Sequence, residues 1–334
     1  MTNPNHPHIN LYRTTKHVAN PFVYLALMAA LSSVSAFADQ NAGDYEVRRV
    51  LNVSYCEHPD EAKTTAGNCD LFLPVDAAKK EDAGIDNIDP AQPSANGKRP
   101  VIVVVHGGAW VAGDKWTMDQ HASKLAEAGY AAVAINYRHA PKHKFPSQVD
   151  DLRVALVWIH DHAEQYDFDL ERVGLYGYSA GGHLVSLIGT LADESWEKVQ
   201  PTTNWSQDDP RWEKMPDIRA VCAGGPPTDF QTLPPDNTSL AFFLGGSRRE
   251  CPENYRAASP VCFVSASDPP IQIVHGESDG IVPIAGSRAF LKKLSDAGTK
   301  ASLFVVPKKG HMLTFISPQL TGTMLEFFHQ HLRR

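Results

Sequence analysis

The feature that most constrains the fold of this chain is the pentapeptide Gly177-Tyr178-Ser179-Ala180-Gly181. Residues 171–176 have the pattern of a short buried strand, and residues 180–191 have that of a helix. A G-x-S-x-G segment between a strand and a helix makes a sharp turn that lifts the serine hydroxyl clear of the sheet. Both glycines are needed because a Cβ at either position would collide with the neighbouring strand or helix. The pentapeptide alone is a weak signal, and its interpretation depends on two further motifs.

The second motif, His106-Gly107-Gly108-Ala109-Trp110, directly follows the β-branched run 100–105. Such a run is typical of a parallel strand covered on both faces. Small residues after it leave backbone N–H groups bare, and these can stabilise a developing oxyanion. We expect donors at Gly108 and Ala109, with Gly107 able to replace one, and at Ala180, which follows the serine. Without the serine turn, the same segment would indicate only a glycine-rich loop.

The third motif lies downstream. A buried strand, 270–276, ends in a turn that carries Asp279, and a strand at 301–306 is followed by a loop that ends at His311. Serine is a poor nucleophile until an imidazole takes its proton, and the imidazole needs a carboxylate to fix its tautomer. The chain order serine, aspartate, histidine is that of a triad built on an α/β sheet. We therefore predict Ser179, Asp279 and His311 as the catalytic residues.

Four other side chains compete for these roles. Asp229 also follows a predicted strand and is the main alternative for the acid, with Glu277 the lesser one. Asp279 is favoured because it stands in the last strand-to-helix turn before the histidine loop. His183 lies only four residues after the serine and is expected to pack or bond locally, and His275 to shape the turn at its strand end.

Taken together, the motifs resemble the α/β-hydrolase esterases related to hormone-sensitive lipase, and among these the bacterial feruloyl and acetyl-xylan esterase-like proteins. The resemblance covers residues 45–332 and is carried by these segments: His106-Gly107-Gly108-Ala109-Trp110, Asn136-Tyr137-Arg138-His139-Ala140-Pro141, Phe145-Pro146, Gly177-Tyr178-Ser179-Ala180-Gly181-Gly182-His183, His275-Gly276-Glu277-Ser278-Asp279 and Gly310-His311. It implies an α/β-hydrolase fold, a mostly parallel central sheet with helices on both faces and a small cap insertion. The hormone-sensitive lipase pattern has a third glycine where this chain has Ala109, so the choice of oxyanion donors stays open.

The N-terminus has the pattern of a secretory signal peptide. Arg13 and Lys16 precede the apolar run 22–31, and Ala36-Phe37-Ala38 follows as a cleavage site. The apolar core of about ten residues is short of the ~20 that span a bilayer. We therefore expect residues 1–38 to be removed and the mature chain to be periplasmic or secreted, without stable membrane insertion.

Charge and cysteine content set further expectations. The formal net charge of −7, without a basic block, argues against nucleic-acid binding. An exported protein can keep disulfides, and Cys56 with Cys69 and Cys251 with Cys262 each bracket a loop, so we expect these two bridges and a buried thiol at Cys222. No C-x-x-C or close Cys/His set indicates a metal site.

The domain organisation follows from the alternation of strands and helices after residue 100, which predicts one catalytic domain over residues 39–334. Residues 192–268 interrupt this rhythm and are expected to form the cap, with Trp196, Trp205 and Trp212 either over the serine or packing the insertion itself. Trp110, Phe242 and Phe243 are candidate walls of the substrate pocket.

The sequence therefore predicts a cofactor-independent serine hydrolase of carboxylic esters of small acyl or aryl acids, acting through an acyl-enzyme. The ester would be a small molecule or be linked to a polysaccharide. Alternatives are an amidase, a peptidase-type or formamidase-like hydrolase, or a non-catalytic binding module on the same fold. The acyl group, the alcohol and the oligomeric state are not encoded in any motif.

Overall fold

The computed structural model describes residues 45–56, 65–76 and 97–333. All of these described residues belong to one compact unit. The expected signal peptide, residues 1–38, lies outside the described residues. Among the helices that the structure describes, none is both long and apolar enough to cross a membrane.

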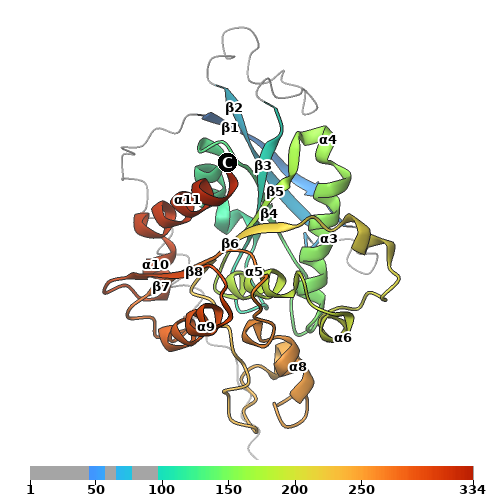
Figure 1. The fold of residues 1–334 in the computed structure, drawn as a ribbon, viewed down its shortest axis with the longest axis vertical. Helices are drawn as coiled ribbons and strands as arrows, with labels where there is room; N and C mark the ends of the chain where they lie inside the picture. Colours follow the sequence, from blue (N-terminus) through green and yellow to red (C-terminus); the bar gives the residue numbers. More distant parts are fainter. Residues whose placement is uncertain (1–44, 57–64, 77–96, 334) are drawn as a thin grey trace, which may run out of the picture. The chain divides into compact units, whose positions relative to one another are not determined.

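The centre of this unit is an eight-stranded sheet in the order β1-β2-β4-β3-β5-β6-β7-β8 (Figure 1). The strands are β1 (Tyr45–Ser54), β2 (Asn68–Asp76), β3 (Arg99–Val105), β4 (Ala131–Ile135), β5 (Phe168–Tyr178), β6 (Ile218–Gly224), β7 (Ile271–Gly276) and β8 (Ala301–Val306). Strand β2 is antiparallel to β1 and β4, and all other neighbours are parallel. Because the six consecutive strands β4-β3-β5-β6-β7-β8 run in one direction, the loops after them meet at one edge of the sheet.

Helices connect these strands. They are α2 (Asp119–Glu127), α3 (Ser147–Asp161), α4 (Ala163–Tyr166), α5 (Ala180–Leu191), α6 (Trp196–Val199), α7 (Ala241–Leu244), α8 (Pro252–Ala257), α9 (Ile284–Ala297), α10 (His311–Phe315) and α11 (Pro318–Leu332), with short 3₁₀ helices η4 (Lys115–Met118), η5 (Gln200–Thr202), η6 (Pro210–Lys214) and η7 (Pro260–Cys262). Pro283 directly precedes α9, as its restricted φ favours.

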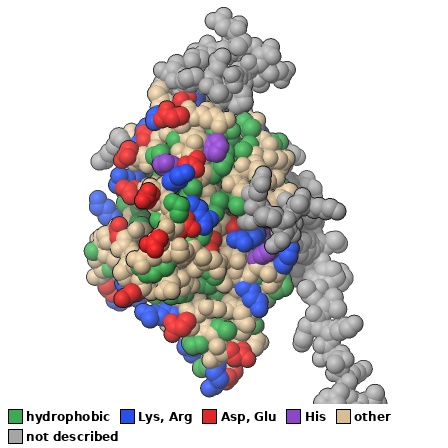
Figure 2. Space-filling view, turned by 90° about the vertical axis from the view of Figure 1, so that its right-hand side faces the viewer, with side chains coloured by type: hydrophobic (Ala, Val, Ile, Leu, Met, Phe, Trp, Pro, Cys, Tyr) green, Lys and Arg blue, Asp and Glu red, His purple; other side chains and the backbone are tan. Residues whose placement is uncertain are grey.

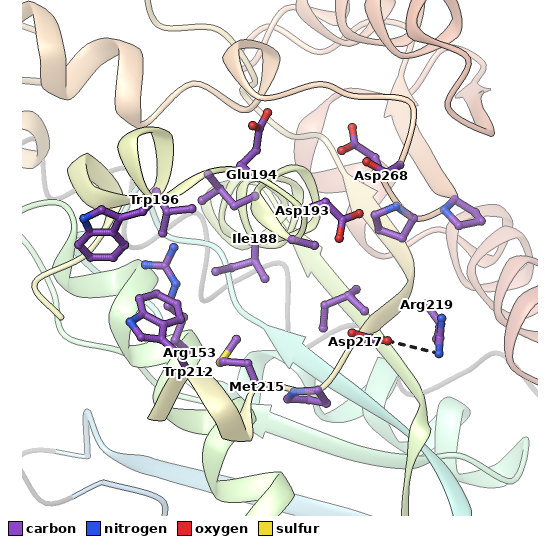
Figure 3. Close-up of a pocket in the computed structure, with 18 of the residues that line it drawn as sticks. Arg153, Ile188, Asp193, Glu194, Trp196, Trp212, Met215, Asp217, Arg219 and Asp268 are labelled. Atoms are coloured by element: carbon purple, nitrogen blue, oxygen red, sulfur yellow. Dashed lines mark ion pairs between the residues drawn. The ribbon is translucent and has the colours of Figure 1, made fainter. Parts of the chain in front are cut away.

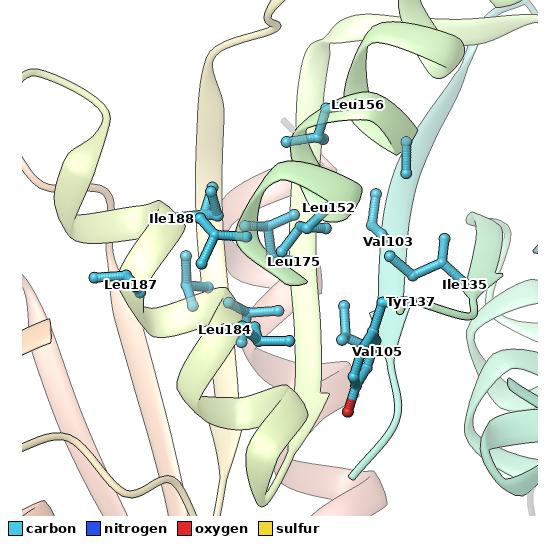
Figure 4. Packing of buried hydrophobic residues seen from close by; sticks show 14 of the residues in the cluster. Val103, Val105, Ile135, Tyr137, Leu152, Leu156, Leu175, Leu184, Leu187 and Ile188 are labelled. Atoms are coloured by element: carbon cyan, nitrogen blue, oxygen red, sulfur yellow. The ribbon is translucent and has the colours of Figure 1, made fainter. Parts of the chain in front are cut away.

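The two faces of the sheet carry separate cores. Successive side chains of a strand point to opposite faces. Val103 and Val105 of β3 pack on one face with the leucines of α3 and α5 (Figure 4). Ile102 and Val104 pack on the other face with residues of α2 and α11. All four β3 side chains are fully buried, which confirms the doubly covered parallel strand and, with the sheet topology, the predicted α/β-hydrolase fold.

The expected cap region, residues 192–268, is not one continuous insertion. Strand β6 lies within it and pairs with both β5 and β7 in the middle of the sheet. It divides the region into residues 192–217, which follow α5, and residues 225–268, which follow β6. Only the second segment starts at the sheet edge where Ser179 lies, because Gly224 at the end of β6 accepts the Ser179 amide at 2.7 Å.

The two expected disulfides are absent from the structure, where all five cysteines are unbridged. Strand pairing sets Cys69 opposite Val53, whereas the amide of Cys56 bonds to Gly67 at 3.2 Å. Cys251 precedes α8 and Cys262 lies beyond it, where its sulfur accepts the side-chain amide of Gln231 at 2.9 Å. The prediction of the two bridges was therefore wrong for this structure. Cys222 is a buried thiol in β6, as expected.

Charged side chains of both signs are interspersed over the face shown in Figure 2. Many form ion pairs between neighbouring elements, such as Lys214 with Asp161 at 2.9 Å and Arg249 with Asp236 at 2.6 Å. Exposed pairs of this kind contribute little to stability individually, about 0–1 kcal/mol. The fold therefore depends on the two apolar layers rather than on surface charge.

Candidate active site

Ser179 occupies the turn between β5 and α5 in a strained backbone conformation, with φ 55° and ψ −119°. Its amide donates to the carbonyl of Gly224 at 2.7 Å, which fixes the turn to the end of β6. A Cβ on Gly177 would collide with the main chain of Gly181, and a Cβ on Gly181 would collide with the carbonyl of Val105. These contacts give the physical reason for both glycines of the motif. Strain of this kind persists only where surrounding structure enforces it, and it is typical of functional positions.

His311 and Asp279 are joined by a hydrogen bond of 2.6 Å between Nδ1 and Oδ2. The two residues follow the adjacent parallel strands β8 and β7, so their loops meet at one edge of the sheet. A carboxylate only accepts at neutral pH, so the proton of the neutral ring lies on Nδ1. This tautomer leaves Nε2 as the basic nitrogen, as a general base requires.

The ring of His311 lies beside the serine turn. The rings of His311 and Tyr178 have centroids 5.1 Å apart, and the Tyr178 hydroxyl donates to the His311 carbonyl at 2.5 Å. A Cβ on Gly225 would be 3.0 Å from Cε1 of His311. Since Tyr178 and Gly224 flank Ser179 on two sides, the three predicted triad residues converge on one part of the sheet edge.

Asp279 is buried and held by several donors. Its Oδ1 accepts the amides of Ile281 at 2.9 Å and Val282 at 2.8 Å, and its Oδ2 also lies 3.2 Å from Nε2 of His275. Burial alone would raise the pKa of this carboxyl, but the hydrogen bonds from His275, His311 and Val282 outweigh burial and hold the pKa well below its usual range. Asp279 is therefore ionised at neutral pH.

The segment after β3 lies against the serine. A Cβ on Gly107 would be 3.1 Å from Cβ of Ser179. The next three residues all have positive φ, 121° at Gly108, 52° at Ala109 and 61° at Trp110. Among the hydrogen bonds formed by the described residues, none uses the N–H of Gly108 or Ala109 as a donor. Ala180 opens α5, and its N–H is one of those that a helix start leaves without a partner in the helix.

The family profile that matches this chain is BD-FAE, over residues 88–294. That match spans more than half of the sequence and contains the serine turn, the predicted oxyanion loop (residues 106–110) and Asp279. The chain belongs to the BD-FAE family. His311 lies beyond the matched residues, and its place in the site is given by the hydrogen bond to Asp279.

Curated relatives of this BD-FAE chain include two proteins from Mycobacterium tuberculosis. The probable carboxylic ester hydrolase LipM is 32% identical over 59% of this chain and 45% of its own length, and the esterase LipC is 27% identical over 67% and 55%. The chain thus spans about half the length of these relatives. Among solved structures, a truncated carbohydrate esterase from gut microbiota superimposes with a TM-score of 0.69 at 24% identity, covering 88% of this chain and 99% of that one. These structural likenesses support the fold.

The alternative candidates for the catalytic acid and base have structural roles instead. Asp229 accepts the amide of Gln231 at 2.9 Å, and Glu277 accepts the amide of Lys308 at 2.9 Å, so both stabilise turns. His183 is fully buried and packs, as one of the two expectations had it, but its side-chain hydrogen bonds are to the distant residues Trp110 and Ala258 rather than local. His275 bonds to its own turn, also as expected, but its contact with Asp279 is one that sequence reasoning missed. The sequence feature that could have indicated this contact is the spacing of four residues between His275, near the end of a strand, and Asp279 in the turn after it.

Of the three candidate pocket residues of this BD-FAE member, Trp110 ends the segment 106–110, and Phe242 and Phe243 belong to a short helix that packs against it. Trp110 and Phe243 are buried and stack with ring centroids 4.3 Å apart, and Phe242 is half-buried on the same short helix, α7. The indole Nε1 of Trp110 donates to Nδ1 of His183 at 3.2 Å, and Nε2 of His183 donates to the carbonyl of Ala258 at 2.6 Å. These contacts join the oxyanion loop, α5 and the second half of the cap region.

The tryptophans of residues 192–217 lie elsewhere, which corrects the expectation that they hang over the serine. Trp196 and Trp212 line a cavity of about 630 Å³ beside the C-terminal half of α5 and the first residues of β6 and β7 (Figure 3). Ser179 precedes the other end of that helix, roughly 18 Å away for twelve residues of helix. Trp212 also packs edge-on against Trp205 at 4.9 Å. These side chains therefore pack the insertion itself, which was the alternative that the sequence left open.

Proposed function

We propose that this BD-FAE chain hydrolyses carboxylic esters with Ser179 as the nucleophile. The observation that carries the proposal is the combination of a strained serine turn with an adjacent imidazole whose Nδ1 is hydrogen-bonded to a buried carboxylate at 2.6 Å. That arrangement is what nucleophilic acyl transfer by serine requires. The named activities of LipM and LipC, both ester hydrolases, support the same reaction class.

In the proposed mechanism, Nε2 of His311 takes the proton of the Ser179 hydroxyl as its oxygen attacks the ester carbonyl. Asp279 stays ionised and stabilises the imidazolium that forms. The N–H groups of Gly108, Ala109 and Ala180 hold the negative oxygen of the tetrahedral intermediate. The intermediate collapses as His311 gives its proton to the leaving alcohol. Water then attacks the acyl-serine with His311 again as base, which releases the acid and restores the enzyme.

For the substrate, we propose esters of short or aryl acids, including acetyl and feruloyl esters, free or linked to a polysaccharide. Trp110, which ends the segment 106–110, stacks on Phe243, and both rings are buried beside the proposed oxyanion donors. A long acyl chain would have to displace them, whereas a short or flat acyl group would not. Phe243→Ala should therefore raise the rate on octanoyl relative to acetyl p-nitrophenyl esters, and Phe242→Ala, which trims a half-buried ring, should raise it less. Highest activity of the unaltered enzyme on emulsified long-chain triglycerides would contradict this proposal.

We further propose that the protein acts outside the cytoplasm after removal of residues 1–38. The support is the pattern of charged, apolar and small residues in that segment. N-terminal sequencing of the protein recovered from the periplasm or medium should give a start near Asp39. Recovery of the uncleaved chain from the cytoplasm alone would contradict export.

The proposed reaction is tested by Ser179→Ala. The variant should lose hydrolysis of p-nitrophenyl acetate and labelling by a fluorophosphonate by at least about 10³-fold, because removal of a triad member costs several powers of ten. Circular dichroism should show an unchanged fold. A variant that is labelled at the normal rate would exclude Ser179, and an unaltered protein that neither hydrolyses esters nor reacts with the probe would favour a non-catalytic binding module.

A further inference from the structure

We propose that His275 is a positioning residue of the active site, which clamps the carboxylate of Asp279 between two imidazoles and thereby sets the basicity of His311. The proposal rests on the proposed serine mechanism. His275 is the penultimate residue of β7 and is completely buried. No motif requires an imidazole there for the reaction itself, since His311 already supplies the base.

The contacts of His275 define its protonation. Its Nε2 lies 2.8 Å from the carbonyl of Val282 and 3.2 Å from Oδ2 of Asp279, and both oxygens can only accept. The proton of the neutral ring is therefore on Nε2, which donates to the carbonyl of Val282 and at the same time lies beside Oδ2 of Asp279. Its Nδ1 lies 2.8 Å from the hydroxyl of Ser287 on α9, which can then donate to it. All polar atoms of the ring are satisfied in this neutral state.

The same oxygen of Asp279 thus faces two imidazole N–H groups, from His311 at 2.6 Å and from His275 at 3.2 Å. Two main-chain amides hold the other oxygen. Tyr178 of β5 also faces this carboxylate; its burial and its closeness to Asp279 raise the pKa of its phenol, so it stays neutral. His275 is accordingly the one side chain of these that competes directly with His311 for the negative charge.

Removal of the His275 N–H should change the pH dependence of the enzyme in one direction only. Without the N–H of His275, more negative charge of Asp279 faces Nδ1 of His311, and protonated His311 is stabilised. A larger share of the enzyme is then protonated, and inactive, at a given acidic pH. The acidic limb of the kcat/KM profile should move to higher pH, while activity at alkaline pH should be less affected.

Two substitutions separate the roles of the two ring nitrogens. His275→Gln can place an amide N–H where Nε2 now lies and keep the contact with Asp279. His275→Asn is shorter, reaches only the position of Nδ1 and keeps the Ser287 side of the network. We expect the Asn variant to shift the acidic limb upward by ~0.5–1 pH unit, the range that loss of one hydrogen bond allows. That shift lowers kcat/KM near pH 5.5 by roughly 3- to 10-fold, and the Gln variant should restore most of it.

The measurements test the role of His275 separately from the proposed serine mechanism. Loss of fluorophosphonate labelling in Ser179→Ala establishes the serine mechanism independently of His275. The low-field proton NMR signal of the His311 Nδ1–H should titrate at higher pH in His275→Asn, a readout that does not need turnover. If His275→Asn does not fold, Ser287→Ala, which releases Nδ1 of His275, should shift the limb in the same direction by a smaller amount. The proposal would be overturned if the folded variants show a lower melting temperature but the same acidic limb of the kcat/KM profile and the same NMR titration as the unaltered enzyme.

Discussion

At the scale of single residues, Asp279 and Asp229 show how position decides chemistry. They follow the neighbouring strands β7 and β6, but only β7 lies next to β8, whose loop carries His311. We predict that Asp279→Asn lowers kcat by roughly 10³–10⁴-fold, because the amide no longer selects the Nδ1–H tautomer of His311. Asp229→Asn should change kcat no more than a few-fold, because Asp229 only caps a turn. Steady-state kinetics of both variants would identify the acid, and a larger loss at Asp229 would contradict our assignment.

Ala109 is a second case at the residue scale, because it stands where the hormone-sensitive lipase pattern has a third glycine. Its φ of 52° lies in the left-handed region, which costs a residue with a Cβ roughly 1 kcal/mol. We predict that Ala109→Gly raises the free energy of unfolding by up to about 1 kcal/mol, measured by urea denaturation. The control Ala112→Gly should instead lower it, since Ala112 is not among the described residues with positive φ. A destabilised Ala109→Gly would show that the strain is relieved by other contacts.

At the scale of elements, the link from Trp110 through His183 to Ala258 ties three segments together. Burial lowers the pKa of His183 to about 4, although the bond to Ala258 opposes this, so the link is neutral and intact at ordinary pH. We predict that His183→Leu lowers kcat/KM at least about 10-fold, because Trp110 loses its acceptor and the oxyanion loop its anchor. The acidic limb of the pH profile should stay in place, since it belongs to His311. A shifted limb in the variant would assign His183 a role in proton transfer.

At the scale of the whole molecule, the lowered pKa values of three buried histidines let us predict how the stability of the fold depends on pH. Burial lowers the pKa of His106, His121 and His183 to about 4, from an ordinary value of 6.5. Between these values the unfolded chain binds more protons than the folded one, so stability falls as the pH falls from about 6.5 to about 4. We predict a melting temperature that decreases over this range, and His121→Gln should make the decrease shallower by the share of one proton. A melting temperature that is constant from pH 7 to pH 4.5 would contradict the neutral buried state of these rings.

The sequence by itself determined the features that are local. The serine turn could be recognised because two glycines, a strand pattern and a helix pattern all lie within about twenty residues. The doubly covered strand β3, the helix start after Pro283 and the α/β alternation are local in the same sense. Each depends on steric or periodic rules that act between near neighbours in the chain.

Only the tertiary structure decided the features that depend on which strands are neighbours. The sequence already favoured Asp279 over Asp229, but only the order β6-β7-β8 places its turn beside the loop of His311 and brings His275 into contact with Asp279. The position of β6 divides the expected cap, and the far end of α5 is where Trp196 and Trp212 lie. The unbridged state of the expected cysteine couples is likewise seen only in the structure. The physical reason is common to all of these: contacts between distant residues are set by the packing of whole elements against a shared core, which no short window of sequence contains.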